Sequence, residues 1–289
     1  MSASDEFFAR ANRLLDRWED MLAGRAQPPD WLHDAYRWRH DRYGMRLVPV
    51  RHPHRVALDD LLCIDRQKTE VVRNTRQFVH GQPANNILLW GARGTGKSTL
   101  IKAVFNAFVD QGLRLIEVEK EHLVDLVEIV DALEARQERF LLYCDDLSFD
   151  ADDAGYKSLK AVLEGSIAAP AANVLIYASS NRRHLLPEMK EDNRDVHVID
   201  GEIHPGDAIE EKVSLSERFG LWLSFYPYTQ DEYLQIVAHW LARLDAGTTA
   251  DEATRLAALA WARQRGSRSG RVAWQFAIDF AGRRKTGDN

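Results

Sequence analysis

A glycine-rich segment at residues 91–99 has the residue types and the spacing of a phosphate-binding loop. It lies between an apolar run and a helical pattern, the context that such a loop requires. Glycines let the backbone wrap closely around phosphates and aim its N–H groups at them. A chance glycine-rich turn is the weak alternative. The predicted binding residues for ATP and Mg²⁺ are Gly91, Ala92, Arg93, Gly94, Thr95, Gly96, Lys97, Ser98 and Thr99.

Two residues of this loop have distinct predicted roles. We expect Lys97 to reach the β- and γ-phosphates, and the Ser98 hydroxyl to ligate magnesium.

Polar residues end two further apolar runs. Asp145 and Asp146 follow the run at 140–144, and Asn181 follows the run at 174–178. Carboxyl ends of parallel strands meet at the ligand-binding edge of a sheet. We expect Asp145 to hold magnesium through water and Asp146 to orient or deprotonate the attacking water. Asn181 would hydrogen-bond that water or the γ-phosphate. Without a phosphate loop nearby, these residues would suit ordinary turns.

Two arginines in the C-terminal third of the chain complete the predicted site. Arg218, just before the last expected strand, can reach a γ-phosphate held by a neighbouring subunit. Arg271, at the start of the last helix, can contact the nucleotide from a lid. The alternatives are a salt-bridged surface arginine for Arg218 and a solvated capping loop for Arg271.

Short apolar runs alternate with longer helical patterns, which predicts an α/β fold with a doubly wound, mainly parallel, five-stranded sheet. The expected strands cover residues 86–90, 113–119, 140–144, 174–178 and 221–226, and the helices between them cover 97–111, 122–137 and 155–168. Three further helical patterns, at 230–244, 251–264 and 269–283, predict a C-terminal helical lid.

The N-terminal region is expected to be helical. An amphipathic helix is predicted from Ser4 to Gly24, and a second from Asp30, carrying Trp31, Tyr36 and Trp38 and ending near Gly44. An extended connector follows at 45–53. The predicted domains are an N-terminal helical region at 1–55, an α/β nucleotide-binding core at 56–227 and a helical lid at 228–289.

The segment at 190–213 reads as an insertion. Its centre alternates apolar and polar residues around Asp200-Gly201, which predicts a β-hairpin that either touches a partner or covers the domain edge. A metal site at His197 and His204 is disfavoured, since no Cys/His spacing pattern accompanies them. Trp222, Tyr226, Trp261 and Trp274 are expected in the core.

The ordered set of phosphate loop, Asp145-Asp146, Asn181, Arg218 and Arg271 resembles the AAA+ superfamily. Residues 58–65 look like the N-terminal box of that superfamily, which implies that Ile64 packs near adenine. The strings at 85–98, 180–188 and 215–225 are similar to a bacterial family of uncharacterised AAA+ ATPases, a domain of unknown function. Most AAA+ motors carry Asp-Glu where this chain has Asp-Asp, so we expect slow turnover.

Composition and charge indicate the cellular compartment and the kinds of partner that the protein can bind. The chain has 289 residues, a formal net charge of -6 and two cysteines, Cys63 and Cys144, in apolar segments. The cysteines are expected to be buried free thiols, and the sequence shows neither a secretory signal nor an apolar run long enough to span a membrane. These features together predict a cytoplasmic protein. The acidic balance disfavours sequence-blind nucleic-acid binding, which needs many cationic contacts to phosphates.

Three functions compete. The favoured hypothesis is a homo-oligomeric ATPase that hydrolyses ATP with Mg²⁺ to switch or remodel an unknown protein partner, with sites shared through Arg218. The alternative is a DNA-associated ATPase of the helicase-loader or transposition-helper type, and a P-loop kinase of a small molecule is the third. A scaffold that binds ATP without cleaving it is the least favoured, because every hydrolytic position is filled.

Overall fold

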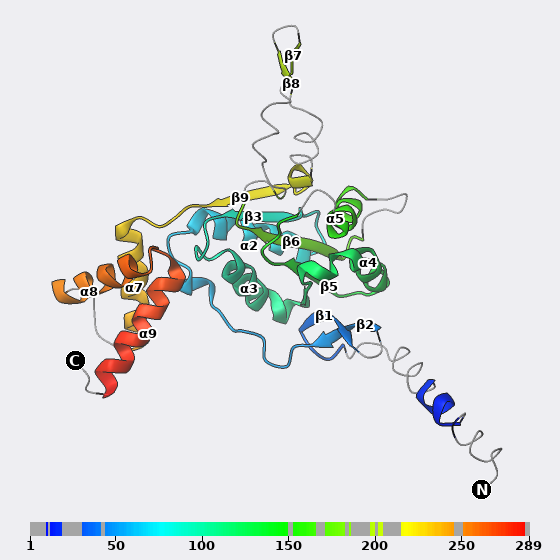
Figure 1. Cartoon of the computed structure of the whole chain (residues 1–289), viewed down its shortest axis with the longest axis horizontal. Helices are drawn as coiled ribbons and strands as arrows, with labels where there is room; N and C mark the ends of the chain where they lie inside the picture. Colours follow the sequence, from blue (N-terminus) through cyan, green and yellow to red (C-terminus); the bar gives the residue numbers. More distant parts are fainter. Residues whose placement is uncertain are drawn as a thin grey trace.

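The structure is a computed structural model in which residues 10, 12–18, 31–41, 44–149, 153–165, 171–182, 185, 197–199, 202–204, 215–245 and 251–286 are described. A sheet covered by helices forms the centre of the molecule, and a group of helices from the C-terminal part of the chain lies at one end of it (Figure 1). This arrangement confirms the predicted α/β core with a C-terminal helical lid.

The central sheet has seven strands in the order β2-β1-β4-β5-β6-β3-β9. All neighbours are parallel except β1 and β2, which pair antiparallel. The five predicted strands are β3 to β6 and β9, so the parallel core is confirmed, but the strand count of five was wrong. The strands are β1 (Ala35–Asp41), β2 (Gly44–Pro49), β3 (Ile87–Gly91), β4 (Leu113–Glu117), β5 (Arg139–Cys144), β6 (Val174–Ser180) and β9 (Leu221–Phe225).

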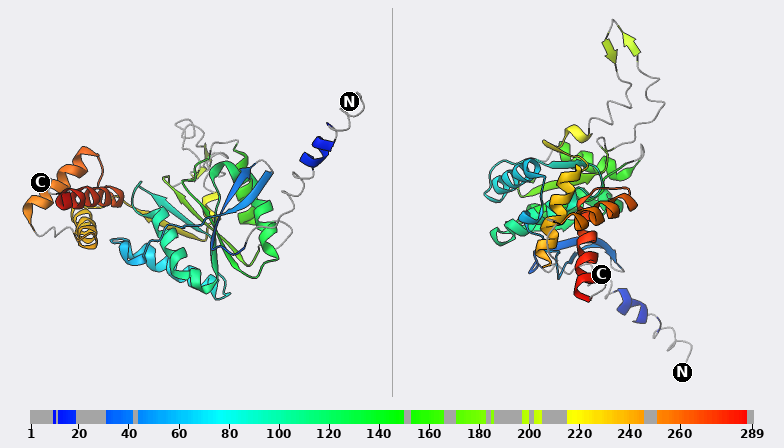
Figure 2. Two further views of the ribbon diagram at one scale, coloured as in Figure 1. Left: turned by 90° about the horizontal axis from the view of Figure 1, so that it is seen from below. Right: turned by 90° about the vertical axis from the view of Figure 1, so that its left-hand side faces the viewer.

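Helices cover both faces of the sheet. Alternate residues of a strand enter different apolar clusters, because side chains point to opposite faces. Leu89 packs in the cluster with α2 (Asp65–Val79) and α3 (Lys97–Phe108), and Leu88 packs with α4 (Leu126–Glu134) and α5 (Ala154–Glu164). Figure 2 shows these layers from two further sides. Short 3₁₀ turns occupy Leu58–Asp60, Val109–Gln111 and Lys120–Asp125.

The second predicted N-terminal helix was wrong, because its residues form the hairpin β1–β2. Tyr36 and Trp38 alternate with Arg37 and are buried together with Leu47, which lies opposite Trp38. This period of two matches a strand and not a helix. The hairpin also replaces part of the expected extended connector at 45–53. It extends the sheet beyond β4, where Arg37 forms an ion pair with Glu117 at 2.5 Å.

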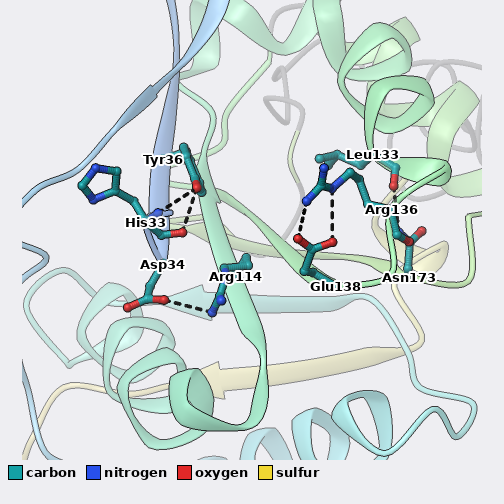
Figure 3. A network of polar contacts seen from close by, with 8 residues as sticks. All are labelled: His33, Asp34, Tyr36, Arg114, Leu133, Arg136, Glu138 and Asn173. Atoms are coloured by element: carbon teal, nitrogen blue, oxygen red, sulfur yellow. Dashed lines mark hydrogen bonds and ion pairs between the residues drawn. The ribbon is translucent and has the colours of Figure 1, made fainter. Parts of the chain in front are cut away.

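Polar contacts fix the chain that enters β1 (Figure 3). Asp34 forms an ion pair with Arg114 at 2.9 Å, and the Tyr36 hydroxyl donates to the His33 carbonyl at 2.8 Å. Nearby, the amide of Asn173 donates to the Leu133 carbonyl at 2.8 Å and so joins α4 to the approach to β6. The hairpin is therefore an integral part of the sheet.

The lid consists of α7 (Gln230–Arg243), α8 (Glu252–Gln264) and α9 (Gly270–Thr286). Thr229 and Glu232 form a capping box at the start of α7, which fixes where that helix begins. Tyr226, expected in the core, is 69% exposed and so corrects that expectation.

Two peripheral predictions are confirmed in part. Residues 12–18 are helical within the predicted first helix, and they expose Leu14, Leu15 and Trp18. The predicted hairpin of the insertion is present as β7 (His197–Ile199) paired with β8 (Glu202–His204), apart from the main sheet (Figure 1). The remainder of residues 190–213 lies outside the described residues.

Both cysteines are free thiols, Cys144 buried and Cys63 partly exposed. Among the described residues, no helix combines the length and the apolar character needed to cross a membrane.

Candidate nucleotide-binding site

The phosphate-binding loop leaves β3 at a position that only glycine fits. Gly91 has φ of 129°, and a Cβ there would lie 2.0 Å from the Phe225 carbonyl oxygen of β9. The next residue, Ala92, donates its N–H to that same oxygen at 3.0 Å. Gly94 and Gly96 also have positive φ. The loop is therefore clamped to β9 while its glycines turn the backbone toward the start of α3.

Lys97 is buried, and its ammonium group has three acceptors. Its Nζ donates to the carbonyls of Gly91 at 2.7 Å and Ala92 at 2.8 Å, and to Oδ1 of Asn181 at 3.1 Å. Burial lowers the pKa of Lys97, the carboxylates of Asp146 and Asp145 oppose that, and Arg93 and Arg271 lower the pKa further. A cation held in this way lies directly between the loop and the ends of the strands.

Asp145 sits at the end of β5 beside Ser98. Its Oδ1 accepts from the Ser98 hydroxyl at 2.7 Å and from the Ser179 hydroxyl at 2.5 Å. Burial alone would raise the pKa of Asp145, but the hydrogen bonds from Ser179 and Ser98, together with the Lys102 charge, hold the pKa below its ordinary value. Asp145 is thus kept ionised next to the Ser98 hydroxyl, as a magnesium ligand requires.

Asp146 and Asn181 face each other across neighbouring strand ends. Asp146 adopts a left-handed backbone with φ of 50°, and its N–H donates to the Ser179 hydroxyl at 3.0 Å. The Asn181 amide donates to Oδ1 of Asp146. An aspartate tolerates this strained conformation better than most residues, and such strain is frequent at functional sites. The turn and the Asn181 amide together fix the position of the second carboxylate.

These groups line a cavity of about 770 Å³ between the sheet edge and the lid. Its polar lining includes Lys97, Ser98, Asp145, Asp146 and Asn181. Its apolar lining consists of Val56, Leu61, Leu62, Ile236, Trp240 and Trp274. A concave site with an apolar lining and a few convergent polar groups suits a nucleotide, with the base against the apolar residues and the phosphates against the polar ones.

Lid and loop touch directly beside the cavity. The N–H of Gly270, at the start of α9, donates to the Gly94 carbonyl at 2.9 Å. The Tyr228 hydroxyl donates to the Thr95 carbonyl at 2.8 Å. Arg271, predicted to contact the nucleotide from the lid, lines the cavity. The loop residues that would hold phosphates are therefore bonded to the lid.

The apolar lining differs in detail from the sequence prediction. Ile64 is buried in the core cluster, and Leu61 and Leu62 line the cavity in its place. Trp274, expected in the core, is 37% exposed and packs edge-on against Trp240 with ring centroids 4.5 Å apart. Trp274 lies on α9 and Trp240 on α7. Both line the cavity because each lies on the side of its helix that faces it.

Arg218 lies elsewhere. It follows the helical turn at Leu215–Glu217, is ion-paired with Glu164 at the end of α5, and is not among the residues that line the cavity. The structure thus brings together all the predicted catalytic residues except Arg218. Ser179 and Tyr228 join them unpredicted. Serine at a strand end and tyrosine after one are too common to signal a site by themselves.

A family model described as "Protein of unknown function (DUF815)" matches residues 32–284. The chain belongs to this family. The match confirms the resemblance to a bacterial family of uncharacterised AAA+ proteins. No curated protein matches the chain.

Solved structures show the same fold. A point variant of RuvB from Thermotoga maritima has a TM-score of 0.51 at 16% identity, over 77% of this chain and 64% of that one. RuvB itself, titled a Holliday junction branch migration motor, gives 0.49 at 16% identity, over 77% and 63%. DnaA from Aquifex aeolicus, bound to AMPPCP, gives 0.45 at 18% identity, over 69% and 58%. This chain spans less than two thirds of the length of each of these relatives. The likeness to the RuvB variant shows that the fold is of the AAA+ type.

Proposed function

We propose that this protein binds ATP with Mg²⁺ and hydrolyses it, and that it works as an oligomeric switch or remodeller of a protein partner. The observation that supports this most is the bonded set of polar residues that line the cavity. Lys97 is joined through Asn181 to Asp146, and Ser98 is joined to Asp145. Phosphoryl transfer needs a cation at the phosphates, a magnesium site and a residue that orients water, and this set contains one of each.

The residues divide this work. When bound, ATP would supply the phosphoryl group, and Mg²⁺ would neutralise negative charge on the phosphate oxygens. Ser98 and the ionised Asp145 would hold the metal, and Lys97 would exchange its carbonyl partners for phosphate oxygens. Asp146 would orient the attacking water or take its proton, with Asn181 fixing its carboxylate. Leu61, Leu62 and the tryptophan pair would enclose the base.

Arg218 supports the proposal of shared sites. It lies outside the cavity of its own chain, as expected of an arginine that acts on the nucleotide of a neighbour. The ion pair with Glu164 would hold it in place until the neighbour arrives. Such an arginine stabilises charge in the transition state and is worth about 10³–10⁵ in kcat where it has been measured.

The experiment measures ATP hydrolysis across protein concentrations, with mass followed by light scattering with and without ATP. Activity that rises more than linearly with concentration, and that Arg218→Ala abolishes while ATP binding persists, supports shared sites. Arg73→Ala is the matched control, because Arg73 is also ion-paired, to Glu70, but lies on α2 away from the cavity. A monomer in which Arg218→Ala hydrolyses ATP normally would refute the shared site. Phosphorylated metabolites would then favour the small-molecule kinase.

Turnover is expected to be slow. Asp146 is shorter by one methylene than the glutamate of most AAA+ motors, so its carboxylate would lie farther from the attacking water. The protein would behave as a switch more than as a fast motor. Asp146→Glu tests this: kcat should rise or hold, whereas a wild-type kcat matching that of vigorous unfoldases would count against the idea.

A DNA partner is the second candidate. Arg263 in the last turn of α8, and Arg265 and Arg268 on the turn between α8 and α9, are exposed. RuvB, whose point variant shares the fold, is titled a Holliday junction branch migration motor. The likeness to RuvB concerns the fold alone, and the net charge of -6 disfavours broad phosphate contact. Stimulation of the ATPase by DNA, declining steeply with salt, would favour this candidate over a protein partner.

The organisation of the chain follows from the same proposal. The nucleotide-binding core would run from residue 56 to 227 and the lid from 228 to 289, with the hairpin β1–β2 as an extension of the core. Free thiols at Cys63 and Cys144 suit a reducing compartment, so we propose the cytoplasm as the site of action.

A further inference from the structure

Two arginines flank the hydrogen bond between loop and lid. Arg93 precedes Gly94 in the phosphate-binding loop, and Arg271 follows Gly270 at the start of α9. The bond from Gly270 N–H to the Gly94 carbonyl, at 2.9 Å, joins the two segments. A Cβ at Gly94 would lie 2.9 Å from the Ser269 Cβ and 3.7 Å from the Arg271 Cβ. The backbones that carry the two guanidinium groups are thus in van der Waals contact.

Both arginines line the same cavity as Lys97. Arg93 and Arg271 are exposed residues. Each lowers the pKa of Lys97, which agrees with two further positive charges close to that ammonium. Within the described part of the chain, neither arginine has a carboxylate within ion-pair distance, although Arg37, Arg114, Arg136 and Arg243 all do.

The two positive side chains suit a shared anion. Like charges that line one cavity repel each other, and water screens that repulsion because both side chains are exposed. An anion between them turns repulsion into two charge-assisted bonds, and the planar guanidinium suits the oxygens of a phosphate. Lys97, by contrast, is buried and has backbone acceptors of its own.

We propose that Arg93 is a specificity-determining residue that, together with Arg271, clamps the terminal phosphate of a nucleoside triphosphate and thereby couples that phosphate to seating of the lid. This deepens the proposed function and rests on it. A diphosphate would occupy the loop and Lys97 but leave the two arginines without an anion. The lid would then seat on ATP and loosen on ADP.

Arg93 would supply the contact to the phosphate from the loop side. Arg271 alone would report on the nucleotide only from the lid side. With Arg93 on the loop side, the terminal phosphate becomes the bridge between two parts of the chain. The two bonds are then coupled, so removal of either arginine should lose most of the preference for triphosphate.

The experiment measures affinity and lid seating, not turnover. Dissociation constants for ATP and ADP, each with Mg²⁺, are compared for the wild type, Arg93→Ala, Arg93→Lys and the control Arg76→Ala, an exposed arginine on α2. Lid seating is read from hydrogen exchange of the amides at 267–274. Arg93→Ala should lower affinity for ATP about tenfold or more, with ADP changed less than threefold. Its ATP complex should exchange at 267–274 like the ADP complex.

The other variants and outcomes test the clamp separately from nucleotide binding itself. Arg93→Lys should recover only part of the ATP preference, because an ammonium cannot bind two phosphate oxygens in one plane. Equal loss of ATP and ADP affinity in Arg93→Ala, or unchanged exchange at 267–274, would overturn the clamp while leaving ATP binding intact. Failure of the wild type to bind either nucleotide would instead refute the proposed function. Far-ultraviolet circular dichroism checks that each variant is folded.

Discussion

The side-chain amide of Asn181 joins Lys97 to Asp146. Its Oδ1 accepts from Lys97 Nζ at 3.1 Å, and its Nδ2 donates to the Asp146 carboxylate. One planar group thus sets the separation between the cation expected at the phosphates and the carboxylate expected at the water. Because both bonds come from one amide, the two ends cannot move independently.

Asn181→Ala should therefore damage hydrolysis more than binding. The Asp146 carboxylate would lose its positioning donor, and kcat should fall by roughly 10²-fold, the scale of a misplaced general base. The dissociation constant for ATP should change less than about fivefold, since Lys97 keeps its other partners. Single-turnover hydrolysis and nucleotide titration check this. A variant with normal kcat would show that Asn181 has no role in positioning.

Asn181→Asp separates the two bonds of the amide. An aspartate retains an acceptor for Lys97 but removes the donor to Asp146 and places a second carboxylate against it. ATP binding should persist while hydrolysis falls at least as far as in Asn181→Ala. Hydrolysis closer to the wild type than to the alanine variant would mean that the contact with Lys97 is the one that matters.

Ser179→Ala should lower the free energy of unfolding by an amount that depends on pH, because the Ser179 hydroxyl helps to keep Asp145 ionised. The pKa of Asp145 is held below its ordinary value, so its bonds add stability above the unfolded-state pKa of about 3.9 and lose it as pH falls through the folded-state pKa. Without the Ser179 hydroxyl, the free energy of unfolding at pH 7 should drop by about 1–2 kcal/mol, and the deficit should shrink toward pH 3.

Ser180→Ala is the control for that experiment. The Ser180 hydroxyl donates to the Leu147 carbonyl at 2.7 Å, and among the described residues it has no carboxylate partner. Its loss should cost a similar free energy at every pH. Urea unfolding from pH 3 to 7 distinguishes the two serines, and parallel curves for both variants would contradict the assigned role of Ser179.

The predictable parts of this molecule are those written locally in the sequence. The phosphate loop and Asp145-Asp146 directly follow apolar runs, and Asn181 follows another after two serines, so strand ends and their polar residues could be placed from spacing alone. The hairpin β1–β2 could not, because Trp31, Tyr36 and Trp38 fit a helical spacing if the alternation from Tyr36 is overlooked. Its pairing with β4 depends on residues about eighty positions away.

Contacts between segments that are distant in the sequence could not be predicted either. The bond from Gly270 to Gly94 and the place of Trp274 in the cavity depend on how α9 meets the loop. Ile64 illustrates the same limit at short range. Leu61 and Ile64 belong to the same core cluster, yet only Leu61 also lines the cavity, and its spacing along the chain does not show this.

Glycine substitutions separate strain from helix propensity. Gly91→Ala should lower the free energy of unfolding by at least about 2 kcal/mol, since φ is 129° and the new Cβ would meet the Phe225 carbonyl at 2.0 Å. Gly282→Ala should raise it by up to about 1 kcal/mol, because Gly282 is helical in α9 and its Cβ would meet nothing within 4 Å. Thermal and urea unfolding test both, and equal effects would contradict the strain at Gly91.

Trp38 tests whether the hairpin belongs to the folded core. Its side chain is 8% exposed in the cluster with Leu47, and its indole N–H donates to the Asp125 carboxylate at 2.9 Å. Trp38→Ala should lower the free energy of unfolding by about 3–5 kcal/mol, and Trp38→Phe, which keeps most of the apolar volume, by about 1–3 kcal/mol. Trp18→Ala, at a residue 63% exposed, is the control and should leave stability within about 0.5 kcal/mol. A loss below about 1 kcal/mol for Trp38→Ala would mean that β1 and β2 unfold independently of the sheet. A loss in the expected range, with a single cooperative transition, would make them part of the unit that positions β4 and the nucleotide-binding edge.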